Sequence, residues 1–127
     1  MSHFTRIKTR IVSLDHLKAA LTDLGYAFQE GRHRIRGYGG QTTAVEIKIP
    51  TRSQGYDLGF VREGEAYTLV ADWYGIHDIK QDVFLRQLTQ RYAYHAVREQ
   101  LAEQDFNLVE ETVDQDQRIH LVLRRMT

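Results

Sequence analysis

The most constraining feature of this chain is a central stretch in which apolar residues alternate with polar ones and the breaks are short. The segment TTAVEIKIP, residues 42–50, places Val45, Ile47 and Ile49 on one side of an extended strand. The segment YDLGFVREGEAYTLVADWYG, residues 56–75, contains two further strand-like runs joined at REGE. Strands joined by so few residues pair antiparallel through a tight turn. The sequence therefore predicts an antiparallel meander in the middle of the chain.

Helical patterns lie on both sides of this meander. SLDHLKAALTDLG, residues 13–25, has leucines at helical spacing, with Ser13 as the expected N-cap and Gly25 as the expected stop. Residues 80–104 are also helical in composition. Further strands are predicted in FTRIKTRIV, in YAFQE and HRIRGY, and in two runs of FNLVEETVDQDQRIHLVLRR. We expect one domain, 1–127, with an α+β fold: an antiparallel sheet with two main helices packed on one face. The nearest common topology is ferredoxin-like, with an inserted meander.

Composition excludes several kinds of function. The chain has no cysteine, which excludes disulfides, thiolate metal sites and cysteine nucleophiles. Its 17 lysines and arginines balance 17 acidic residues, so net charge does not attract it to nucleic acid or anionic lipid. The N-terminal MSHFTRIKTRIVSL lacks a signal-peptide core, and no apolar run approaches the roughly 20 residues that span a bilayer. We expect a soluble cytosolic or stromal protein without membrane insertion.

Two predicted strands, TRIKTR and RHRIR, carry basic residues at every second position. If both strands belong to one sheet, these residues form a basic face on a neutral protein, and this face would contact an acidic protein or an RNA backbone. The alternative is an ordinary solvated face, paired with Glu46, Glu110 and Glu111 on neighbouring strands. The residues concerned are Arg6, Lys8, Arg10, Arg32, Arg34 and Arg36.

The glycine-rich segment RGYGGQTT, residues 36–43, follows the second basic strand. Glycines allow a positive φ, and the exposed amides of Gly39 and Gly40 could form an anion-binding nest. Tyr38 is placed to stack on a base or to contact a protein partner. The segment matches neither a Walker A sequence nor GxGxxG. A flexible hairpin or bulge is the simpler explanation.

Acidic and imidazole side chains cluster locally in ADWYGIHD, residues 71–78. Asp72 and His77, beside Trp73 and Tyr74, form the candidate ligand region, because a half-buried carboxylate near an aromatic ring can exchange protons with imidazole. The alternative is structural: the two aromatic residues fill a core edge, and Asp78 or Asp82 caps the next helix. We assign no catalytic residue, no cofactor and no metal site, because no nucleophile lies beside a base and the histidines lack metal-ligand spacing.

The second helix carries two apolar stripes on nearly opposite sides. A helical projection separates five residues from three others. Either this helix is buried on two sides or kinked near Arg91, or one stripe forms a homodimer through residues 84–104. The first stripe contains Phe84, Leu85, Leu88, Tyr92 and Ala96, and the second contains Tyr94, Val97 and Leu101. The neighbouring Gln90, Arg91 and Arg98 are amphipathic residues of the kind enriched at interfaces.

The segments MSHFTRIKTRI, LGY, RGYGGQTT, YDLGFVREGEAYTLVADWYGI and FLRQLTQRYAYHAVREQLAEQ together resemble the hypothetical chloroplast open reading frame thirty-five family. The resemblance extends over essentially the whole chain and supplies no catalytic residues. It implies a cyanobacterial or plastid source and a place in the cytoplasm or the plastid stroma. Because some members are encoded close to a small ferredoxin, it implies a ferredoxin or an assembly factor as the candidate partner.

We therefore expect a non-catalytic binding, assembly or regulatory protein that contacts an acidic protein through its basic sheet face and its glycine-rich loop. RNA binding through the same face is the first alternative. An enzyme or ligand-binding protein centred on Asp72 and His77 is the second.

Overall fold

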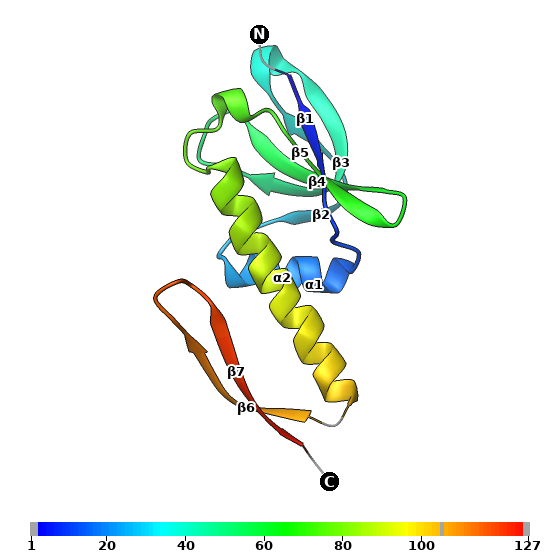
Figure 1. Cartoon of the computed structure of the whole chain (residues 1–127). Helices are drawn as coiled ribbons and strands as arrows, with labels where there is room; N and C mark the ends of the chain where they lie inside the picture. The colour runs from blue at the N-terminus through cyan, green and yellow to red at the C-terminus, as the bar shows by residue number, and fades with distance from the viewer. Residues whose placement is uncertain (1–2, 105, 126–127) are drawn as a thin grey trace.

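The computed structural model describes residues 3–104 and 106–125. The helices and strands follow one another in an order that matches the predicted segments closely (Figure 1). The elements are β1 (Thr5–Lys8), α1 (Leu14–Asp23), β2 (Gln29–Arg36), the 3-10 turn η1 (Tyr38–Gly40), β3 (Thr42–Pro50), β4 (Asp57–Glu63), β5 (Ala66–Ala71), the 3-10 turn η2 (Trp73–Gly75), α2 (Gln81–Glu103), β6 (Phe106–Val113) and β7 (Ile119–Arg125).

Two antiparallel sheets account for the strands. The main sheet has the order β1-β5-β4-β3-β2, and β6 pairs only with β7. The predicted α+β class is confirmed, but the ferredoxin-like topology is wrong because, within residues 106–125, the strands after α2 pair with each other and not with the main sheet. The physical reason is the length of α2, which separates β6 from the main sheet. Helix α2 has 23 residues, which makes it about 35 Å long, so its C-terminal end lies far from the main sheet (Figure 1).

The main core lies between the main sheet and the two helices. Helix α1 starts where predicted, since Ser13 Oγ accepts a hydrogen bond from the His16 amide at 3.2 Å. It ends at a Schellman-type turn at Gly25, whose φ is +81°. Both helices pack on one face of the sheet, as expected. The fully buried residues of this core include Leu17, Leu21, Ile47, Ile49, Leu58, Phe60, Leu69 and Leu88.

The other face of the sheet is partly covered by the β2–β3 hairpin, which curls back over it. Ile35 and Val45 from the hairpin pack against Val70 in a second, smaller core. Val45 was predicted to share a face with Ile47, yet it belongs to this second core. Gly59 permits the close approach, because a Cβ there would overlap the Val45 side chain. The sheet therefore has no fully open face.

Helix α2 is continuous and is buried on two sides. Phe84 and Leu88 pack into the main core, whereas Tyr94, only 7% exposed, lies on the opposite side. The Tyr94 hydroxyl donates a hydrogen bond to Glu111 Oε2 of β6 at 2.8 Å. Figure 1 shows the β6–β7 hairpin beside α2 and away from the main sheet. Tyr94 of the second apolar stripe thus has a partner within the same chain, whereas Val97 of that stripe is 44% exposed. Homodimerisation through this helix stays a prediction.

Candidate binding surface around the glycine-rich loop

The six predicted basic residues come from two separate segments of the chain and differ in their partners. Strands β1 and β2 lie at opposite edges of the main sheet, with β5, β4 and β3 between them. On β1, the Arg6 guanidinium is paired with Glu63 of β4, with an Nε–Oε1 distance of 2.9 Å. The Arg6 hydrogen bond, partly opposed by burial, lowers the pKa of Glu63. Lys8 and Arg10 are exposed farther along the same edge.

Arg36 holds the curled hairpin against the sheet instead of facing a partner. Its backbone amide and its Nε both donate to Asp57 Oδ2, at 2.8 and 3.0 Å, and its Nη2 donates to Oδ1 at 3.1 Å. Asp57 is completely buried, and Lys48 Nζ lies 4.0 Å from the same carboxylate. The hydrogen bond from Arg36 to Asp57 raises the pKa of the guanidinium.

None of the three predicted acidic partners pairs with the basic strands in the described residues: Glu46 lies on β3 without an ion pair there. Glu110 and Glu111 lie on the separate β6–β7 hairpin. Glu63 and Asp57 take their place, because strand order decides which carboxylates lie beside which arginines.

Arg32 and Arg34 remain exposed along β2. Arg34 Nε donates to Thr42 Oγ1 at 2.9 Å and its Nη2 to the Thr42 carbonyl at 3.4 Å. Within residues 3–104 and 106–125, no carboxylate bonds to either guanidinium. These two positive charges are therefore available to an acidic partner.

The glycine-rich loop and the Asp72 region, which are far apart in sequence, meet in space. The Asp72 carboxylate is 1% exposed and accepts hydrogen bonds from the amides of Tyr38, at 3.0 Å, and Tyr74, at 3.2 Å. Gly39 and Gly40 have φ angles of +66° and +77°, which confirms the predicted need for glycine there. Asp72 thus joins η1 to η2.

Three tyrosines and the glycines beside them form a surface that we call the aromatic corner: Tyr38, Gly39, Gly40, Tyr56, Tyr74 and Gly75. The rings of Tyr38 and Tyr74 pack edge to face, with their centroids 6.1 Å apart. Tyr38 is 48% exposed and Tyr74 is 69% exposed. The Tyr56 ring lies directly against Gly75. Burial and the negative charge of Asp72 raise the pKa of the Tyr56 hydroxyl. A depression of about 420 Å³ lies beside this corner, lined in part by Ser53 and His77.

The geometry of the Asp72 region favours a structural role over a proton relay. In the described residues, both Asp72 hydrogen bonds come from backbone amides, and neither comes from His77. The His77 amide donates to Ser53 Oγ at 2.9 Å, and its side chain is exposed. Trp73 packs against the main core, as expected, with its Nε1 buried and without a hydrogen-bond acceptor among the described residues.

The predicted capping of α2 by Asp78 or Asp82 is wrong. The N-cap residue is Lys80, without a side-chain hydrogen bond to the helix. Asp78 instead binds the loop after β3, accepting from the Arg52 amide at 2.9 Å and from Ser53 Oγ at 2.6 Å. Burial would raise the pKa of Asp78, but these hydrogen bonds lower it.

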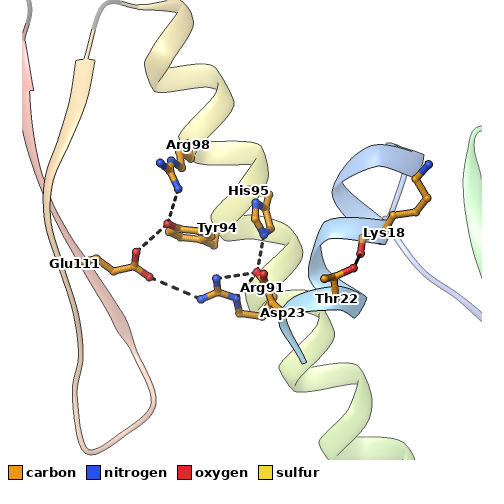
Figure 2. Close-up of polar contacts among 8 residues, drawn as sticks. All are labelled: Lys18, Thr22, Asp23, Arg91, Tyr94, His95, Arg98 and Glu111. Carbon is orange, nitrogen blue, oxygen red and sulfur yellow. Dashed lines mark hydrogen bonds and ion pairs between the residues drawn. The ribbon is translucent and has the colours of Figure 1, made fainter. Parts of the chain in front are cut away.

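A polar junction that connects α1, α2 and β6 was missed by the sequence analysis (Figure 2). Asp23 at the end of α1 accepts hydrogen bonds from Arg91, at 2.8 and 3.0 Å, and from His95 at 2.6 Å. Arg91 also approaches Glu111 to 3.8 Å, and Arg98 donates to the Tyr94 hydroxyl at 3.1 Å. The helical spacing indicated the α2 residues, but nothing local indicated Asp23 or Glu111.

This junction is expected to weaken in acid. Burial alone would raise the pKa of Asp23, yet the hydrogen bonds and positive charge of His95 and Arg91 lower it below its ordinary value. The stabilisation from the charged carboxylate is therefore complete above the unfolded-chain pKa of about 4 and is lost as the pH falls through the folded value. The variant Asp23→Asn lacks this stabilisation at every pH.

Urea unfolding of both proteins from neutral to acidic pH measures the effect. The difference in free energy of unfolding between wild type and Asp23→Asn should be constant near neutrality and should shrink below about pH 4. A difference that persists unchanged into strong acid would contradict the role of Asp23.

The described residues contain neither a metal-binding cluster nor a membrane-spanning helix. Residues 3–104 and 106–125 contain no group of three histidine or acidic side chains close enough to hold a metal ion. No helix in the same residues combines the length and apolar character that crossing a membrane requires.

Comparison with known proteins identifies a matching family and several similar proteins. Residues 20–122 match the model of the family described as "Protein of unknown function (DUF1257)". The "Uncharacterized protein ycf35" of Guillardia theta is 40% identical, and that of Cyanophora paradoxa is 37% identical, each over 98% of both chains. The protein with the same description from Pyropia yezoensis is 35% identical over 98% of both chains. No solved structure matches the chain.

Proposed function

This chain belongs to the DUF1257 family, and on that premise we propose that it is a non-catalytic binding protein whose aromatic corner, with Arg32 and Arg34, contacts an acidic protein. The carrying observation is the pair of exposed rings, Tyr38 and Tyr74, held in edge-to-face contact. Exposed tyrosines and arginines are enriched in protein interfaces. This supports docking over catalysis.

The aromatic corner is organised before any partner arrives. Asp72 accepts hydrogen bonds from the amides of Tyr38 and Tyr74, and Tyr56 packs against Gly75 in the η2 turn. Binding therefore costs little conformational entropy, because the turns that carry the two rings are already ordered in this protein. A low entropy cost favours binding even through a small interface.

The charges select the kind of partner. Arg32 and Arg34 lie on β2, the strand that leads into the glycine-rich loop, and bond to no carboxylate of residues 3–104 or 106–125. Positive side chains complement an acidic surface and accelerate its association. The resemblance noted in the sequence implies a ferredoxin as a candidate, and a small, transient interface suits such a partner. The proposal places this encounter in the plastid stroma or the cyanobacterial cytoplasm.

The experiment is a binding titration with a purified acidic ferredoxin as probe. The charge-reversal variant Arg32→Glu/Arg34→Glu is expected to weaken binding at least about tenfold at low salt, because two attractive contacts become repulsive. Tyr38→Ala/Tyr74→Ala should weaken binding comparably without changing its salt dependence. Wild-type affinity should fall as salt is added.

The matched control is Arg124→Glu, the same charge change on β7, outside the proposed surface. This variant should bind like wild type. The proposal would be contradicted if wild type and the Arg32→Glu/Arg34→Glu variant bound the ferredoxin with equal affinity at low salt and also after salt is added. Binding of a single-stranded RNA through the same arginines, without ferredoxin binding, would replace the protein partner with RNA.

A further inference from the structure

A second site lies where α2 faces the turn of the β6–β7 hairpin, distant from the aromatic corner. The crevice has a volume of about 540 Å³, within the range of pockets that hold small molecules. Its lining includes the apolar residues Leu24, Val113 and Ile119. The proposed docking surface uses none of these residues.

One wall of the crevice is a polar stripe of α2. Arg86 and Gln90 are four residues apart, as are Gln87 and Arg91, so their side chains project from one side of the helix. This stripe adjoins the side that carries Phe84 and Leu88, since Arg91 lies about two turns after Phe84.

The opposite wall is the hairpin turn, which supplies Gln115, Gln117 and Arg118. Gln117 has a φ of +63°, unusual for a residue other than glycine. Its carbonyl accepts a hydrogen bond from the Gln90 side chain. This bond connects the two walls, so the crevice exists only because the hairpin docks on the helix.

The crevice has an excess of positive charge that the chain does not neutralise. Arg86 and Arg118 approach from opposite walls, and neither guanidinium bonds to a carboxylate in the described residues. Arg91 is already engaged by Asp23 and Glu111. Asp116 is the acidic residue among those lining the crevice. Two guanidinium groups are thus available to an anion.

We propose that this crevice binds a small nucleoside phosphate. The planar forks of Arg86 and Arg118 suit the oxygens of a phosphate. The amides of the surrounding glutamines donate and accept hydrogen bonds, which matches the polar edge of a base. The apolar side chains among the lining residues can lie against the flat face of that base. Phosphate, polar edge and flat ring together describe a mononucleotide, and the volume accommodates one.

Such a ligand bridges the hairpin and the helix, which makes binding detectable through stability. A ligand that binds only the folded protein raises its melting temperature as its concentration increases. Melting curves and calorimetric titrations with AMP, GMP, adenosine and inorganic phosphate therefore test the site on the intact chain.

AMP or GMP is expected to bind and to raise the melting temperature, and Arg86→Gln/Arg118→Gln should weaken that binding at least about tenfold. Arg124→Gln, on the same hairpin but outside the crevice, should leave it unchanged. In wild-type protein, amide chemical shifts should move at Gln87, Gln90 and Gln117, which locates the ligand independently of any variant. Three results would overturn the proposal: no binding of either nucleotide, equal binding to the double variant, or binding of phosphate or adenosine alone as tight as that of AMP.

Discussion

Replacing Asp57 with alanine is expected to lower the free energy of unfolding by about 3 kcal/mol, the largest loss among the polar substitutions considered for this chain. The carboxylate is completely buried and accepts three hydrogen bonds from Arg36, one from the backbone and two from the guanidinium. Without it, the Arg36 amide loses its acceptor and Lys48 loses its nearby negative charge. The β2–β3 hairpin would then lose its polar attachment to the start of β4.

Glu63→Ala is the matched control, because Glu63 also pairs with an arginine but is exposed. Exposed ion pairs contribute little, since water and salt screen them. Urea unfolding followed by circular dichroism should therefore show a large loss for Asp57→Ala and almost none for Glu63→Ala. Similar losses in the two variants would mean that burial does not distinguish these ion pairs.

Replacing Gly75 with alanine is expected to cost about 2–3 kcal/mol through overpacking, although only one methyl group is added. A Cβ at this position would overlap the ring of Tyr56. Either the ring or the η2 turn must move, and movement of the turn displaces Tyr74 from Tyr38. The same substitution should therefore also weaken binding of the acidic partner.

A double-mutant cycle with Tyr56→Ala isolates this clash. In the Tyr56→Ala background, Gly75→Ala should cost far less, because the overlapping ring is gone. Tyr74→Ala, next in sequence but 69% exposed, should barely change the stability. The free energies of unfolding of the four proteins measure the coupling, and a cost of Gly75→Ala that is independent of Tyr56 would contradict the steric explanation.

Local features of the fold were predictable because short-range physics determines them. The two-residue period places strands β3, β4 and β5 correctly. Ser13 caps α1 as predicted, and Gly25 ends it, because both roles depend on backbone geometry within a few residues. The two stripes of α2 correctly indicated burial on two sides.

The candidate site was only partly predictable. Tyr38 and Tyr74 were both singled out, but their contact was not, because they are far apart in the sequence and meet through tertiary contacts such as the Asp72 hydrogen bonds that join their turns. The basic face was predicted as one surface, and the strand order places its two halves at opposite edges. Arg36 changed from a proposed docking residue into the partner of a buried carboxylate.

The sequence alone thus determined the class of fold, the start and end of α1, and the segments from which a binding surface could be built, because periodicity, caps and glycine positions act over a few residues. The tertiary structure decided which charges remain available and which rings meet. Those outcomes depend on strand order and on the curl of the β2–β3 hairpin, which bring distant residues together. For the same reason, the crevice between α2 and the β6–β7 turn appears only when the hairpin has docked on the helix.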